Sequence, residues 1–156
     1  MKKMGNRGFT LVEVLAVIVI VTLISAIAIP NVLSTIGVGK SKSEEIMIDN
    51  IKTASSQMYE EVEFSGTTNA NGDIVSDLLD NGNKIKILKN TNYIVFHLQA
   101  LVDNGFLTGN GVDNSEVLIN PKTGKNIGNC EVKITKSSND RFSFSNVSGS
   151  NCPNLG

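Results

Sequence analysis

The chain has an apolar first part and a polar second part, which meet near Pro30. Residues 9–29 form a run of 21 residues in which Glu13 is the single charged residue. As a helix this run would be about 32 Å long, close to the ~30 Å thickness of the hydrocarbon core of a bilayer. In lipid the backbone must satisfy its own hydrogen bonds, so the many β-branched residues do not prevent a helix. The pattern predicts a membrane-spanning helix.

Basic residues flank this run on its amino side. Lys2, Lys3 and Arg7 precede it, and none follows it closely. The positive-inside rule therefore places residues 1–8 in the cytoplasm and residues 31–156 outside. We expect a single-pass protein of the inner or cytoplasmic membrane, with its amino terminus inside.

Two other interpretations of this segment stay open. The apolar core Leu11–Ile24 and the small residues within 26–28 also fit a secretory signal peptide. That interpretation predicts a secreted binding or adhesive module whose mature chain begins at Ile29, although the carboxylate of Glu13 is unusual in such a core. An uncut chain would instead be a singly anchored surface receptor.

A joint is expected after the apolar run. Pro30 removes a backbone hydrogen-bond donor, and Gly37 and Gly39 lower helix propensity. We expect residues 30–39 to be flexible or partly unwound, or to form a plain loop.

A second helical pattern covers residues 40–64. Its apolar residues recur at steps of three and four and share one stripe, while charged residues occupy the other faces. The stripe consists of Met47, Ile51, Ala54, Met58 and Val62. An apolar stripe at this spacing is typical of a helix that packs on a core.

The remaining chain shows strand and turn patterns. Residues 84–87 alternate as a short strand, and the apolar positions of 93–104 indicate a short helix. The alternating segments 130–136 and 141–147 flank a turn and indicate a hairpin. Its inward-facing residues would be Val132, Ile134, Phe142 and Phe144. The pattern predicts an α+β fold in which a long amino-terminal helix packs on a small antiparallel β-sheet.

Composition argues against several classes of function. The net charge of −1 and the lack of a long basic run disfavour direct binding of nucleic acid. The chain has one histidine, His97, and two cysteines, which are too few ligands for a single chain to assemble a zinc site of the usual kind. No phosphate-binding glycine loop, nucleophile elbow or calcium-loop order is present. We expect no enzyme activity, no catalytic residue, no metal and no cofactor, and a structural role for His97.

Cys130 and Cys152 stand at the two ends of the expected hairpin. Two cysteines in an extracytoplasmic domain favour a disulfide, which would contribute about 3 kcal/mol in the chain-entropy model. A reactive thiol pair is the alternative, but the spacing is not that of a redox motif.

Residues 7–15, Arg-Gly-Phe-Thr-Leu-Val-Glu-Val-Leu, follow a basic leader and open the apolar run. This segment resembles the amino-terminal signature of type IV prepilins and pseudopilins. In that family the prepilin peptidase, a membrane-embedded aspartic peptidase, cuts after the glycine, and the new terminal phenylalanine is N-methylated. The resemblance implies cleavage between Gly8 and Phe9, with Phe9 as N-methylphenylalanine.

Further roles follow from the same resemblance. Glu13 would pair with the amino terminus of a neighbouring subunit during assembly, and Pro30 matches the helix-disrupting proline of mature pilins. The pair Cys130–Cys152 resembles the carboxyl-terminal disulfide of many pilins. The implied organisation has four parts, a cleaved leader (1–8), a transmembrane and assembly helix (9–29), a joint with an amphipathic second helical half (30–64) and an extracytoplasmic head domain (65–156).

The resemblance implies a type IV pilin, a structural subunit of a cell-surface filament. Its partners would be further copies and other pilins, the prepilin peptidase, the pilus assembly platform and the membrane, with no direct contact to nucleic acid. A pseudopilin of a type II secretion or competence DNA-uptake system is the alternative within the same family.

Overall fold

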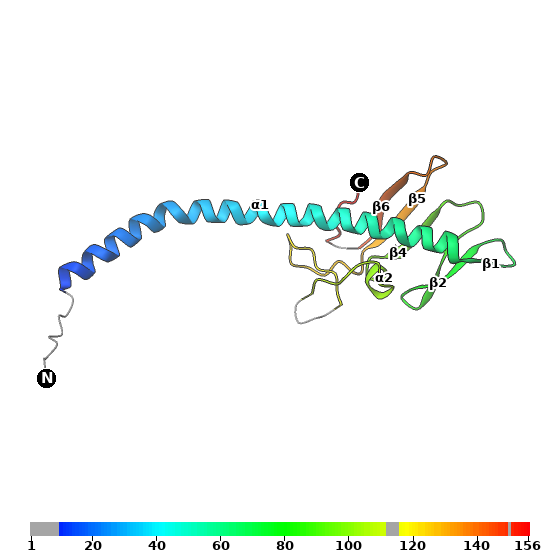
Figure 1. Ribbon diagram of the computed structural model, residues 1–156, viewed down its shortest axis with the longest axis horizontal. Coiled ribbons are helices and arrows are strands. Elements are labelled where there is room, and N and C mark those ends of the chain that lie inside the picture. Colours follow the sequence, from blue (N-terminus) through cyan, green and yellow to red (C-terminus); the bar gives the residue numbers. More distant parts are fainter. Residues whose placement is uncertain (1–9, 112–115, 150) are drawn as a thin grey trace, which may run out of the picture. The chain divides into compact units, whose positions relative to one another are not determined.

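The computed structural model describes residues 10–111, 116–149 and 151–156, without the side chains of residues 26–34. It consists of a long helix α1, a short helix α2 and two three-stranded antiparallel sheets (Figure 1). This confirms the α+β class, although a single small sheet was expected. The chain divides into two compact units, the first ending at Gly39 and the second beginning at Lys40.

Helix α1 spans Leu11–Ser65 and is helical throughout residues 30–39. The expectation of an unwound joint or loop in these residues is therefore wrong. Extending an existing helix adds one hydrogen bond per residue without a new nucleus, which offsets the low propensity of Gly37 and Gly39. Over the residues that the structure describes, no helix has the length and apolar character needed to cross a membrane.

In the second unit one face of α1 enters the core. All five residues of the predicted stripe, from Met47 to Val62, are buried, which confirms that prediction. Tyr59 is buried beside them and packs edge-on against Phe142, with 5.4 Å between ring centroids. Full burial of a Leu, Ile or Met side chain contributes about 1.5–3 kcal/mol, so this stripe anchors the helix.

The first sheet has the order β1-β2-β3, with strands Thr67–Thr68, Ile74–Asp80 and Asn83–Ile87. The strand predicted over 84–87 is thus confirmed, and the other two strands were missed. Asn81 and Gly82 join β2 to β3 with φ values of 49° and 79°. A two-residue turn with positive φ at both positions favours Asn-Gly, so this dipeptide was an available hairpin signal.

The second sheet has the order β4-β5-β6, with strands Tyr93–His97, Glu131–Lys136 and Phe142–Ser148. The hairpin of β5 and β6 confirms the prediction. Its four expected inward residues are buried or pack against the core.

The short helix expected over residues 93–104 is wrong in its first half. Tyr93–His97 forms β4, and helix α2 covers only Gln99–Asp103. The β4 sequence, Tyr-Ile-Val-Phe-His, is rich in aromatic and β-branched residues, which fit a half-buried strand. Pairing along the whole length of β4 with β5 decides in favour of the strand.

One hydrophobic core fills the second unit. It joins α1 and α2 to strands β3, β4 and β5 and includes Leu155 from the carboxyl-terminal tail. The helix therefore packs against both sheets through a shared set of apolar side chains.

Candidate functional site

The start of α1 is capped by Thr10. The backbone N–H of Glu13 donates to the carbonyl oxygen of Thr10 at 3.1 Å and to its hydroxyl at 3.3 Å. A threonine at the cap and a glutamate three residues later match the capping-box pattern, which was readable from the sequence. The Glu13 side chain is exposed in the first helical turn, where the helix dipole favours negative charge.

The helical turns that follow expose apolar side chains on every side. Between Leu11 and Ile24 these side chains are 48–81% exposed. They are Leu11, Val12, Val14, Leu15, Val17, Ile18, Val19, Ile20, Val21, Leu23 and Ile24. A helix that is apolar all round is stable only where lipid or other apolar helices surround it.

The hydroxyl groups of Thr22 and Ser25 form hydrogen bonds within the helix. The hydroxyl of Thr22 donates to the carbonyl oxygen of Val19, and that of Ser25 to the carbonyl oxygen of Val21, each at 2.8 Å. These bonds remove the cost of placing two hydroxyl groups in an apolar environment. Glu13 is then the polar group that stands out, because no cation pairs with it among residues 10–111, 116–149 and 151–156.

The other residues assigned to processing and assembly are only partly visible. Gly8 and Phe9 lie outside the described residues, as does the side chain of Pro30, whose backbone is helical. The structure therefore places Glu13 at the start of α1 and does not test the cleavage position.

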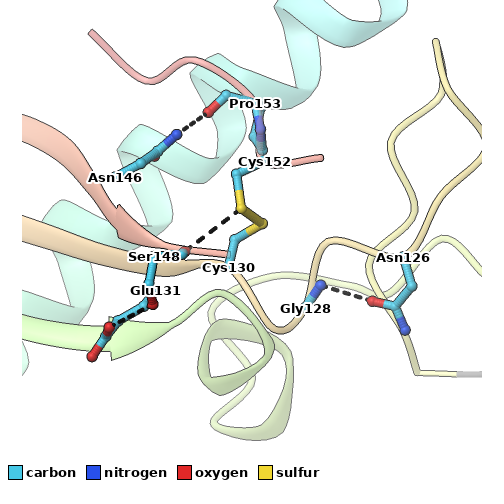
Figure 2. The surroundings of a disulfide bond; sticks show 8 residues. All are labelled: Asn126, Gly128, Cys130, Glu131, Asn146, Ser148, Cys152 and Pro153. Atoms are coloured by element: carbon cyan, nitrogen blue, oxygen red, sulfur yellow. Dashed lines mark hydrogen bonds between the residues drawn. A yellow bond between two sulfur atoms is a disulfide. The ribbon is translucent and has the colours of Figure 1, made fainter. Parts of the chain in front are cut away.

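Cys130 and Cys152 form a disulfide, with 5.6 Å between their Cα atoms (Figure 2). Cys130 lies directly before β5 and is buried, and Cys152 belongs to the carboxyl-terminal tail. The bond closes a loop with a sequence separation of 22 residues. In the chain-entropy model it contributes about 3 kcal/mol, which ties the tail to the sheet.

His97 connects the two sheets. Its backbone N–H donates to Oδ2 of Asp80 at 3.1 Å, and its Nδ1 lies 3.0 Å from the same carboxylate oxygen. Asp80 ends β2 and His97 ends β4, so this contact joins strands of different sheets. In the described part of the chain no cluster of His, Cys, Asp or Glu side chains could hold a metal ion.

Two ionic clasps that sequence reasoning missed join α1 to the rest of the second unit. Near the start of this unit, Oε1 of Glu44 accepts a hydrogen bond from Nδ2 of buried Asn120 at 2.9 Å, and Lys122 Nζ lies 3.0 Å from Oε2. The hydrogen bond from Asn120, followed by that from Lys122, lowers the pKa of Glu44. The partners lie 76 residues apart in sequence, so no local pattern could reveal them.

The second clasp lies at the end of α1. Lys136 Nζ at the end of β5 is 2.6 Å from Glu63 Oε2 and 3.6 Å from Asp140 Oδ1. The hydrogen bond to Glu63 raises the pKa of Lys136. The first clasp fastens α1 to the loop that carries Asn120, and the second fastens it to the end of β5.

Comparison with known families identifies the amino-terminal segment. The family model described as a prokaryotic N-terminal methylation motif matches residues 3–29, which is the class III prepilin leader signature. The match covers most of the basic leader and the whole apolar run, so the resemblance noted in the sequence is confirmed over these residues. No curated protein and no solved structure matches the chain.

Proposed function

We propose that this protein is a type IV pilin subunit, a structural component of a surface filament assembled through its amino-terminal helix. The observation that carries the proposal is the prepilin methylation motif at residues 3–29, on a helix that exposes apolar side chains all round. Such a helix needs lipid before assembly and neighbouring apolar helices afterwards. A filament with these helices at its centre meets the second need.

Processing would prepare the helix for assembly. Hydrolysis of the amide between Gly8 and Phe9 removes the leader with its three cations, Lys2, Lys3 and Arg7. Gly8 leaves the backbone unhindered for a protease. The product has an α-ammonium group on Phe9, which is then N-methylated and stays basic.

Glu13 would set the register between subunits. It lies four residues beyond Phe9, or about 6 Å along a helix. An unpaired carboxylate costs on the order of 3 kcal/mol at the middle of a bilayer, and less near the interface. Pairing with the Phe9 ammonium of a neighbouring subunit removes that cost at one axial offset, whereas other offsets leave a buried charge unpaired.

The protein would occupy two locations, one before and one after assembly. The precursor spans the cytoplasmic membrane through residues 9–29 with its head outside, and the mature chain joins a surface filament. The partners are the prepilin peptidase, the assembly platform and other pilins. Pseudopilins of secretion or DNA-uptake systems share the same amino-terminal motif, so recovery of the chain in sheared surface filaments separates the two roles.

Amino-terminal mass analysis of the protein recovered from cells tests the proposal. The expected mature chain begins with N-methylphenylalanine at Phe9. A chain that begins at Ile29 would indicate an ordinary signal peptide, and an intact Met1 would indicate a permanent anchor. Either of these results overturns the filament proposal.

A further inference from the structure

The edge strands of the two sheets differ in how they are protected against pairing with foreign strands. β1 is two residues long, and β3 carries exposed Lys84 and Lys86, charges that discourage strand addition. On β4 the backbone N–H of His97 is occupied by the carboxylate of Asp80. β6 is seven residues long and has neither a charged residue nor a proline. Its own sequence does not protect it.

The pairing of β6 with β5 determines which of its backbone groups face outward. The N–H of Ser137 donates to the carbonyl oxygen of Arg141 at 2.8 Å, and the same register continues through Ser143 and Ser145. Hydrogen-bonded positions alternate along an antiparallel strand, so these odd-numbered residues bond to β5. The outward-facing N–H and C=O groups belong to Phe142, Phe144 and Asn146.

Residues 151–156 lie beside this outer edge without pairing with it. Asn146 Nδ2 donates to the carbonyl oxygen of Pro153 at 2.7 Å (Figure 2). A Cβ placed on Gly156 would lie 3.4 Å from the carbonyl oxygen of Phe144. No backbone hydrogen bond joins this tail to β6 within the ranges that the structure describes. The tail therefore covers the edge as a strap, and Pro153 has no N–H with which to extend the sheet.

The strap is held by a disulfide, by buried side chains and by hydrogen bonds. The disulfide cross-links Cys152 to Cys130, and the side chains of Pro153 and Leu155 are buried, that of Leu155 at 1% exposure. Two side-chain hydrogen bonds also hold the strap. Asn146 Nδ2 donates to the carbonyl oxygen of Pro153, and Lys125 Nζ donates to Oδ1 of Asn151 at 2.9 Å. The disulfide limits the conformational freedom of these six residues, so its reduction makes release of the strap more favourable.

We infer that residues 151–156 are a disulfide-held strap over the outer edge of β6, and that reduction frees this edge to pair with β6 of a second copy. A dithiol reductant supplies two electrons and two protons. The bond between Cys130 and Cys152 breaks, both become thiols, and the reductant forms its own disulfide. The strap then leaves Phe144 and Asn146, and their backbone groups become available for strand pairing.

A second copy of the chain fits this edge because β6 is compatible with itself. Antiparallel pairing centred on Phe144 places the outward groups of Phe142 opposite those of Asn146 in the other copy. The pairs formed by Phe142, Phe144 and Asn146 are then all of the hydrogen-bonded kind, and the seven uncharged residues bring no like charges together. Ser143 of one copy lies opposite Ser145 of the other. The oxidised strap thus keeps the heads of neighbouring subunits apart at this edge, independently of filament assembly.

The test uses the full chain in detergent micelles, because α1 needs an apolar environment. Light scattering gives the protein mass of each complex, and hydrogen exchange reports on the β6 amides. The Cys130→Ser/Cys152→Ser variant, and wild type in excess dithiothreitol, should associate at least tenfold more tightly than oxidised wild type. The amides of Phe144 and Asn146 should become protected as the protein concentration rises. Any association through α1 is common to all samples and cancels in the comparison.

Charge variants in the Cys→Ser background test the partner and the register. Ser143→Lys/Ser145→Lys and Ser143→Glu/Ser145→Glu should each lose the additional association, and an equimolar mixture of the two should regain it. Equal association of the oxidised and reduced proteins overturns the inference. Association that persists in the lysine variant, or that the mixture does not restore, overturns it too, since unfolding or nonspecific contact would not follow the charge pairing.

Discussion

Glu44 on α1 accepts a hydrogen bond from the buried side chain of Asn120 at 2.9 Å, across 76 residues of sequence. Asn120 also accepts the backbone N–H groups of Lys122 and Thr123 through its Oδ1. One side chain thus holds the loop of residues 118–127 in shape and fastens it to the helix. Stability of the second unit should depend on this contact and on pH.

Replacement of Glu44 should destabilise the second unit, and more so when the hydrogen-bond acceptor is lost together with the charge. Glu44→Gln keeps an acceptor for Asn120 and removes the charge, so we expect a cost of about 1 kcal/mol at pH 7. Glu44→Ala leaves a buried donor unpaired and should cost about 2 kcal/mol. Urea unfolding followed by circular dichroism measures both, and Glu45→Gln at the neighbouring exposed position should have a smaller effect.

The contribution of Glu44 should disappear in acid. Its pKa lies below its ordinary value of 4.5 in the folded protein because of the hydrogen bonds from Asn120 and Lys122. The charged form is therefore favoured by folding, and the stabilisation is complete above about pH 4.5 and lost as pH falls through the folded pKa. Wild type and Glu44→Gln should differ at pH 7 and converge once the pH has fallen below the folded pKa of Glu44. A difference that stays constant with pH would contradict this assignment.

Truncation of the buried helix stripe should be more costly than any surface change. Met58 is fully buried, and Met58→Ala should lower the unfolding free energy by about 2–5 kcal/mol, through lost burial and the cavity left behind. Ile46 lies on the same helix and is 52% exposed, so Ile46→Ala should change it by less than about 0.5 kcal/mol. Similar costs at the two positions would mean that α1 presents a different face to the core.

Alanine at Gly37 and Gly39 should stabilise the helix locally. Neither position has a neighbour within 4 Å of an added Cβ, so the substitution meets no steric obstacle. Alanine is favoured over glycine in a helix by about 1 kcal/mol, which predicts roughly fivefold slower hydrogen exchange per substitution in the surrounding turns. The measurement is made on the full chain in micelles. Unchanged or faster exchange would indicate that these residues are not helical in solution.

Neutralisation of Glu13 should separate processing from assembly. If Glu13 pairs with a neighbouring amino terminus, Glu13→Gln should be cut and methylated normally, and sheared filaments should fall at least tenfold in amount. Glu61→Gln, an exposed acidic residue on α1 in the second unit, is the matched control and should assemble normally. Assembly of Glu13→Gln at the wild-type level would contradict the role of Glu13 in register.

Local patterns in the sequence were sufficient for several elements. The stripe from Met47 to Val62 and the hairpin of β5 and β6 depend on periodicities of 3.6 and 2 residues, which arise from the geometry of the helix and the strand themselves. The amino-terminal motif is contiguous, so residues 3–29 could be recognised without any fold. Cys130 and Cys152 were paired correctly because they are the only two cysteines in the chain.

Other features arose only when distant segments met. The Tyr93–His97 segment is a strand because β5, more than thirty residues later, offers it a hydrogen-bonding partner. Residues 30–39 remain helical because a helix already formed on one side continues through weak positions. The contacts of Glu44 with Asn120 and of His97 with Asp80 join residues far apart in the chain. Sequence alone determined which faces are apolar and where the amino-terminal methylation motif lies, because both are local properties. Tertiary structure decided strand pairing, the ionic clasps and the strapped edge of β6. Each of these depends on favourable contacts between segments that are far apart in the sequence and meet only when the chain folds.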